Sequence, residues 1–156
     1  MYTGGQYRIR IINGPNLNML GIREPQIYGA MTLGEICARI REAATDLPAD
    51  LDFFQSNHEG SIVDQVQNTY FESLDGAVIN PGALTHYSYA VRDAIAAVPV
   101  PFVEVHLSDV SQREEFRRTS VTAPVCLKQI AGHGWRGYVE ALECLVRFLS
   151  GKEKSV

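Results

Sequence analysis

The chain contains 156 residues, of which 46% are hydrophobic and 21% are charged, and its formal net charge at neutral pH is −4. A chain of this length and composition can bury the core of one globular domain, which excludes a largely disordered protein. The acidic net charge and the lack of a basic cluster argue against a nucleic-acid binder. The longest apolar run, residues 94–103, contains two prolines and is too short to span a bilayer.

Segments with strand character alternate with segments of helical periodicity along the chain. Strands are predicted over residues 7–13, 51–56, 76–80, 101–107 and 125–131, and helices over 32–44, 61–73, 87–97 and 137–149, with a short charged helix in 109–118. This alternation is typical of a parallel sheet with helices on both faces. We therefore expect an α/β fold in one domain, residues 1–156, with its core in 7–149 and loose ends at 1–6 and 151–156.

Helical spacing predicts which side chains turn inward. The first helix begins with the capping box Thr32-Leu33-Gly34-Glu35, and the second and last helices place Tyr70 and Tyr138 in their apolar stripes.

The three cysteines, Cys37, Cys126 and Cys144, lie in apolar patterns, as buried thiols in a reducing compartment do. With no signal-peptide pattern at the N-terminus, we expect a soluble cytoplasmic protein.

Polar residues follow the predicted strands at their carboxyl ends, where open parallel sheets bind ligands. The segments are Asn13-Gly14-Pro15-Asn16, Gln55-Ser56-Asn57-His58-Glu59-Gly60, Asn80-Pro81-Gly82-Ala83-Leu84-Thr85-His86 and His106-Leu107-Ser108. Because strand side chains alternate, Glu104 and His106 share one face of the fourth strand. The carboxylate can then support a protonated imidazole, which is the arrangement of a general acid.

A candidate base lies in the long loop after the first strand. Arg23 and Tyr28 occur there together, and a guanidinium beside a phenol lowers the pKa of the phenol. The loop therefore predicts a tyrosinate that abstracts a proton.

These segments together resemble the type II 3-dehydroquinate dehydratases over about residues 8–149. The resemblance lies in the strand-end segments above, in the loop with Arg23-Glu24-Pro25 and Ile27-Tyr28-Gly29, and in Glu104-Val105-His106-Leu107-Ser108. It implies a flavodoxin-like fold with a five-stranded parallel sheet, and a homododecamer built as a tetramer of trimers. It also implies dehydration of 3-dehydroquinate to 3-dehydroshikimate through an enolate, in the shikimate or quinate pathway, with no cofactor, metal or Schiff base.

The resemblance assigns catalytic roles to five residues. Tyr28 is the base, activated by Arg23, and Asn16 holds a water on the enolate oxygen. His106 protonates the departing hydroxyl, and Glu104 holds His106 in place.

The resemblance also implies a substrate-binding set. Asn80 and the backbone N–H groups of Leu107 and Ser108 bind the carboxylate, a role that amides at a helix start can fill. His86 and Arg117 bind ring hydroxyls, with Arg113 as a neighbouring contact. Asp93 reaches the site of the adjacent subunit in a trimer.

Each residue also has a structural interpretation that the residues alone leave open. Tyr28 could cover an apolar surface, Asn16 and Asn80 could cap turns, and His106 with Glu104 could be a buried polar pair. Departures from the family pattern occur at Leu84, Thr119 and His133, and none of these carries an assigned catalytic role.

Other classes of function fit the sequence less well. A receiver domain needs a carboxylate cluster and a flavin site needs a phosphate-cradling loop, and neither follows the first strand here. A zinc site of His86, His106 and Glu104 lacks the spacing of metal ligands. The remaining rival is a domain that binds quinate-like acids without turning them over.

Overall fold

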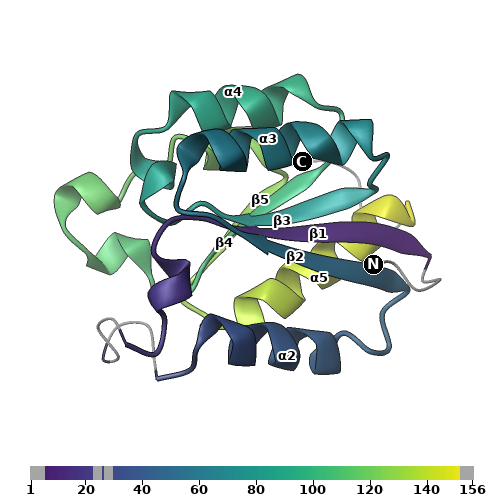
Figure 1. Cartoon of the computed structure of the whole chain (residues 1–156), viewed down its shortest axis with the longest axis horizontal. Coiled ribbons are helices and arrows are strands. Elements are labelled where there is room, and N and C mark those ends of the chain that lie inside the picture. The colour runs from purple at the N-terminus through teal and green to yellow at the C-terminus, as the bar shows by residue number, and fades with distance from the viewer. Residues whose placement is uncertain (1–5, 23–25, 27–29, 152–156) are drawn as a thin grey trace.

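The computed structural model describes residues 6–22, 26 and 30–151, and within them five parallel strands form one sheet. The strands are β1 (Tyr7–Asn13), β2 (Ala49–Gln55), β3 (Gly76–Asn80), β4 (Phe102–His106) and β5 (Lys128–Ala131), in the order β2-β1-β3-β4-β5 (Figure 1). The chain therefore reverses its winding direction between β1 and β3. This confirms the predicted α/β, flavodoxin-like class.

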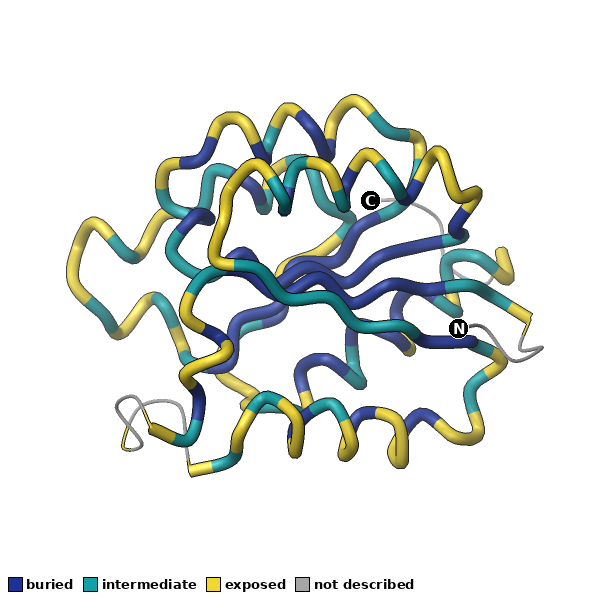
Figure 2. The backbone as a smooth tube through the Cα atoms, viewed as in Figure 1, coloured by how far each residue is buried: buried dark blue, intermediate teal, exposed yellow. Residues whose placement is uncertain are grey.

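Helices cover both faces of the sheet. The helices α2 (Leu33–Ala43) and α5 (Arg136–Leu149) lie on one face, and α3 (Glu59–Phe71) and α4 (Tyr89–Ala97) lie on the other (Figure 1). Successive strand side chains point to opposite faces of the sheet and pack into two separate hydrophobic cores. Ile9 and Ile11 pack with α2 and α5, whereas Ile12 packs with α3 and α4. Figure 2 shows the buried sheet between helices with exposed outer faces.

The start of α2 follows the sequence pattern. Thr32 Oγ1 accepts a hydrogen bond from Glu35 N at 3.2 Å, and Glu35 Oε2 accepts one from Thr32 N at 2.8 Å. This is the predicted capping box, and it satisfies two backbone donors that the helix itself leaves unpaired.

The end of α3 differs from the prediction. Tyr70 was expected to face inward, but 55% of its surface is exposed, and its ring packs edge-on against Phe71 with the ring centroids 5.5 Å apart. Thr69 takes the inward position instead, because the stripe advances by three residues from Val66 rather than by four. The Thr69 hydroxyl donates to the Val66 carbonyl at 2.6 Å, so burial leaves no unpaired donor there.

Two further segments correct the predicted elements. Residues 125–127 are not part of a strand, because η5 (Ala123–Val125) forms a 3-10 turn around Pro124 and β5 begins only at Lys128. The charged segment forms two 3-10 turns, η3 (Val110–Gln112) and η4 (Glu115–Arg117), rather than one short helix. Of the three cysteines predicted to be buried, Cys144 is buried while Cys37 and Cys126 are partly exposed.

The loops that follow β1 and β3 touch backbone to backbone. Gly14 N donates to Asn80 O at 2.8 Å, and a Cβ on Gly14 would lie 2.4 Å from the Pro81 carbonyl oxygen. Gly82 adopts a φ of +59°, and a Cβ there would lie 2.9 Å from the Pro15 carbonyl oxygen. Glycine is needed at both positions for the two loops to meet.

Gly14→Ala is expected to lower the free energy of unfolding by about 1–3 kcal/mol, because the contact is with backbone and cannot relax by a side-chain rotation. Urea denaturation measures the change. Gly60→Ala is the matched control, since a Cβ at Gly60 meets nothing within 4 Å and the residue lies in α3. Equal stability of the two variants would contradict the proposed close contact.

Candidate active site

A pocket opens at the carboxyl ends of β1, β3 and β4, where the winding of the sheet reverses. Its lining residues are Pro15, Asn16, Leu17, Asn80, Gly82, Ala83, His86, His106, Leu107, Ser108, Val110, Arg113 and Arg117. The pocket thus gathers amide, imidazole and guanidinium groups from segments far apart in the sequence. This is the place where an open α/β sheet binds its ligand.

The loop after β1 brings Asn16 to the pocket in a constrained conformation. Asn16 has a φ of 68° and precedes the 3-10 turn η1 (Leu17–Met19). Its backbone N–H donates to Asn57 Oδ1 at 2.9 Å, and Gln55 Nε2 donates to the Gly14 carbonyl at 3.2 Å. Residues at the end of β2 therefore hold the turn that carries Asn16. A left-handed conformation at a non-glycine residue is a recurrent feature of functional sites.

Asn80 is fixed by a residue of α5. Its Nδ2 donates to Tyr138 Oη at 2.9 Å, and Tyr138 Oη donates to Asn13 Oδ1 at 2.6 Å. Asn80 Oδ1 also accepts from Gly82 N at 3.2 Å. Burial raises the pKa of the Tyr138 phenol above its ordinary value, so this tyrosine stays protonated, and its neutral hydroxyl accepts from Asn80 and donates to Asn13.

Glu104 and His106 form a buried pair on β4. Glu104 has no exposed surface, His106 is 6% exposed, and His106 Nε2 lies 2.9 Å from Glu104 Oε2. Burial alone raises the pKa of Glu104, but hydrogen bonds and the charge of His106, with further donors, outweigh it and hold that pKa below its usual value of 4.5. The carboxyl group is therefore ionised at neutral pH.

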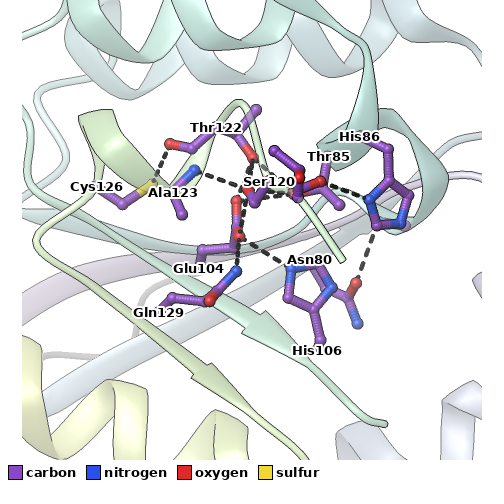
Figure 3. A network of polar contacts seen from close by, with 12 residues as sticks. Asn80, Thr85, His86, Glu104, His106, Ser120, Thr122, Ala123, Cys126 and Gln129 are labelled. Atoms are coloured by element: carbon purple, nitrogen blue, oxygen red, sulfur yellow. Dashed lines mark hydrogen bonds and ion pairs between the residues drawn. The ribbon is translucent and has the colours of Figure 1, made fainter. Parts of the chain in front are cut away.

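Side chains from three other segments also donate to Glu104 (Figure 3). Thr85, in the 3-10 turn η2 (Gly82–His86), donates to Oε1 at 3.1 Å, and Thr122 donates to the same oxygen. Ser120 and Gln129 donate to Oε2 at 2.9 and 2.8 Å. Such a set of donors replaces the water that burial removes from the carboxylate.

The hydrogen bonds fix the tautomers of both pocket histidines. Since a carboxylate only accepts, His106 Nε2 carries the proton shared with Glu104, and Nδ1 is the ring nitrogen that Glu104 does not engage. His86 Nδ1 lies 2.8 Å from the Thr119 carbonyl oxygen, so Nδ1 is protonated and Nε2 is left as an acceptor in the neutral ring. The neutral rings therefore leave different nitrogens unengaged, Nδ1 in His106 and Nε2 in His86, and the Glu104 carboxylate can in addition stabilise a protonated His106 ring.

Two arginines give the pocket a positive side. Arg117 Nε lies 2.9 Å from Glu114 Oε2, outside good hydrogen-bond geometry, and its guanidinium carbon lies 4.8 Å from the centre of the Phe116 ring. Arg113 lines the pocket beside it. Guanidinium groups here favour an anionic or hydroxyl-rich ligand.

The structure brings most of the predicted site residues together. Asn16, Asn80, His86, His106, Leu107, Ser108, Arg113 and Arg117 line the pocket, and Glu104 lies behind His106. Asp93 is exposed on α4 and is not part of this lining. Arg23 and Tyr28 lie outside the described residues.

Sequence reasoning missed several residues of the site. Ser120, Thr122 and Gln129 surround Glu104, and Tyr138 was interpreted as part of an apolar stripe. Ser120 and Thr122 are two positions apart, and this spacing is a weak sequence signal that both hydroxyls lie on the same side of an extended segment. A tyrosine in a buried stripe is a stronger one, since its hydroxyl requires a partner.

Within the described ranges, no three His, Cys, Asp or Glu side chains are grouped as metal ligands would be. No helix in the same part of the chain has the length and apolar character needed to cross a membrane.

The fold and the pocket define the class of protein. A doubly wound parallel sheet that holds a carboxylate-supported imidazole beside amides and guanidinium groups, at its winding reversal, has the site of an enzyme for small polar substrates. The family model for dehydroquinase class II matches residues 7–146. The chain belongs to this family and is an enzyme of the type II 3-dehydroquinate dehydratase class.

Relatives and solved structures agree with this membership. The chain is 54% identical to a 3-dehydroquinate dehydratase of Lachnospira eligens over 140 residues, covering 89% of this chain and 95% of the relative. It is 55% identical to one of Roseiflexus castenholzii over 139 residues, covering 89% and 88%. The crystal structure of a type II dehydroquinase from Butyrivibrio crossotus superposes with a TM-score of 0.87 at 51% identity, covering 90% of this chain and 97% of that one.

The buried carboxylate predicts an acid-dependent stability. Because folding lowers the pKa of Glu104, its ionised form contributes stability above about pH 4.5, and this contribution is lost as the pH falls through the lower pKa of the folded state. The difference in unfolding free energy between wild type and Glu104→Gln should therefore shrink on acidification. Urea denaturation from pH 7 to pH 3 measures it.

Glu143→Gln on α5 is the control for that series, since Glu143 is exposed. Its difference from wild type is expected to change little with pH. A gap for Glu104→Gln that stays constant over the same range would refute the ionised, donor-stabilised carboxylate.

Proposed function

We propose that the chain converts 3-dehydroquinate to 3-dehydroshikimate by anti elimination of water through an enolate. The observation that carries this proposal is the Glu104–His106 pair, 2.9 Å apart and buried at the edge of a pocket lined with amides and guanidinium groups. Such a pair supplies a general acid, which loss of a hydroxide-like leaving group requires.

The proposed reaction has two proton transfers. Tyr28, as a tyrosinate next to Arg23, takes a proton from the carbon beside the ketone, and the electron pair moves to the ketone oxygen as an enolate. Asn16 holds a water that stabilises this oxygen, as an oxyanion-hole group does.

In the second step, His106 as an imidazolium gives its Nδ1 proton to the departing hydroxyl. The enolate electrons re-form the ketone, the new carbon–carbon double bond forms, and water leaves. Glu104 stabilises the imidazolium and holds Nε2, so that Nδ1 is directed away from the carboxylate. Return of the tyrosine proton to the histidine, through solvent, resets the site.

The binding roles follow the chemistry of the lining residues. Asn80 with the backbone of Leu107 and Ser108 would bind the substrate carboxylate, and the hydrogen bond that Asn80 donates to Tyr138 fixes its amide for this task. His86 presents Nε2 to a ring hydroxyl. Arg117 contacts a second hydroxyl, with Arg113 beside it.

The assembly and location of the enzyme belong to the same proposal. We infer a homododecamer, a tetramer of trimers, in which Asp93 contributes to the neighbouring subunit's site. The exposed position of Asp93 on α4 is compatible with such a contact. A place in the cytoplasm accords with three cysteine thiols and no disulfide among the described residues.

Purified protein is expected to produce an ultraviolet-absorbing conjugated product from 3-dehydroquinate. Because the proposed mechanism uses neither a metal nor an imine, the rate should survive a chelator and borohydride added with substrate. A continuous absorbance assay measures both. Substrate binding without any product would instead identify the non-catalytic binder left open by the sequence, and inactivation by borohydride would indicate an imine.

Tyr28→Phe is expected to lower kcat by at least about a thousandfold while substrate still binds, because only the proton acceptor is lost. Steady-state kinetics and calorimetric titration with substrate measure the two effects. Tyr89→Phe is the control, since Tyr89 is an exposed phenol on α4 outside the pocket lining. Near-normal turnover of Tyr28→Phe would exclude this tyrosine as the base.

A further inference from the structure

Residues 119–122 reach both histidines of the pocket from one short segment. The Thr119 carbonyl accepts from His86 Nδ1 at 2.8 Å, and Ser120 Oγ donates to Glu104 Oε2 at 2.9 Å. Thr122 Oγ1 donates to the other oxygen of Glu104. Since Glu104 in turn holds His106, the segment is in contact with one histidine and one bond removed from the other (Figure 3).

The surrounding hydrogen bonds indicate which acceptor each hydroxyl proton of this segment points to. Ser120 Oγ accepts a hydrogen bond from the Ala123 backbone N–H at 2.9 Å, which leaves its own single proton for an acceptor. The Ser120 and Thr122 hydroxyls lie 3.2 Å apart, and Thr85 Oγ1 lies 2.7 and 2.8 Å from them. The carboxylate is the pure acceptor in this cluster, so its charge orients the hydroxyl protons toward it.

The segment is itself anchored to the rest of the fold. Val121 N donates to the Thr85 carbonyl at 2.7 Å, and Arg92 Nη1, from α4, donates to the Val121 carbonyl at 3.0 Å. Both bonds use the backbone between Ser120 and Thr122. The two hydroxyls are therefore held in position by groups that do not touch the pocket.

A general acid needs its imidazole in one orientation, and a carboxylate that rotates cannot give it one. His106 and Gln129 share Oε2 with Ser120, while Thr122 and Thr85 hold Oε1. Donors on both oxygens stop rotation of the carboxylate about its own axis. Removing the Ser120 or the Thr122 hydroxyl takes away one of these donors, so the plane of the carboxylate becomes less restrained.

We infer that Ser120 and Thr122 are positioning residues of the dehydration reaction, acting through Glu104 to hold His106 as the proton donor. This inference deepens the proposed function and rests on it for the identity of the reaction. Neither residue lines the pocket, so their effect is expected on the proton-transfer step and not on binding.

Thr122→Val and Ser120→Ala remove one hydroxyl each. Loss of a donor to a charged group is expected to lower kcat about tenfold for each variant with KM changed less than about threefold. Because the ionised carboxylate is less stabilised, the pH at which protonation of Glu104 begins to reduce kcat should also rise. The titratable groups facing Glu104 are His106 and Cys126, and His86, Arg113 and Arg117 face the pocket side of His106.

A second readout requires no turnover. Exchange of the His106 Nε2 proton with solvent, followed by NMR on ¹⁵N-histidine-labelled protein, is expected to be at least about tenfold faster in both variants, because a carboxylate held by fewer donors releases this proton more often. If the wild type fails to dehydrate 3-dehydroquinate, the proposed function falls, and this exchange rate still decides the positioning role.

The controls separate positioning from general loss of structure. Thr122→Ser restores a hydroxyl and is expected to restore kcat, the pH profile and slow exchange. Thr69→Val also removes a buried threonine hydroxyl, but one bonded to Val66 in α3, and should leave all three readouts at wild-type values. Wild-type kcat, pH profile and exchange in Ser120→Ala and Thr122→Val would overturn the inference. If Thr122→Val does not fold, Ser120→Ala decides.

Discussion

The carboxylate of Glu104 is fully buried, and the rest of the site is arranged around that constraint. An ion without water is costly unless donors replace its hydration, and neighbouring segments supply those donors here. Thr85 follows β3, Ser120 and Thr122 precede η5, and Gln129 lies on β5. The ionised carboxylate thus accepts hydrogen bonds from the segments beside β4, at the end of the sheet where the pocket opens.

The same carboxylate gives the pocket its chemical asymmetry. By holding Nε2 of His106, Glu104 leaves Nδ1 as the unengaged nitrogen, whereas the Thr119 carbonyl imposes the opposite tautomer on His86. Two identical side chains thereby leave different ring nitrogens unengaged. The His86 assignment depends directly on the Thr119 carbonyl, and the inferred positioning role of Ser120 and Thr122 links the same segment to His106 through Glu104.

On the β1 side, the pocket depends on close approach of two loops. Gly14 and Gly82 allow the turns after β1 and β3 to meet, which places Asn16 and Asn80 on one pocket wall. Tyr138 then joins the ends of both strands from α5 through Asn13 and Asn80. Since Tyr138 stays protonated, it acts as a structural donor and differs in role from the tyrosine base proposed in the loop after β1.

Local pattern determined the positions of β1 and β3, the capping box of α2 and the shared face of Glu104 and His106, because these features depend on residues a few positions apart. The strand-end motifs likewise identified most of the pocket lining. Only the tertiary structure decided which side chains surround Glu104, because strand register and the path of residues 119–122 depend on packing between distant segments. The same reason explains why Thr69 replaced Tyr70 in the core and why the hydroxyl of Tyr138, within an apolar stripe, became a link between two strand ends.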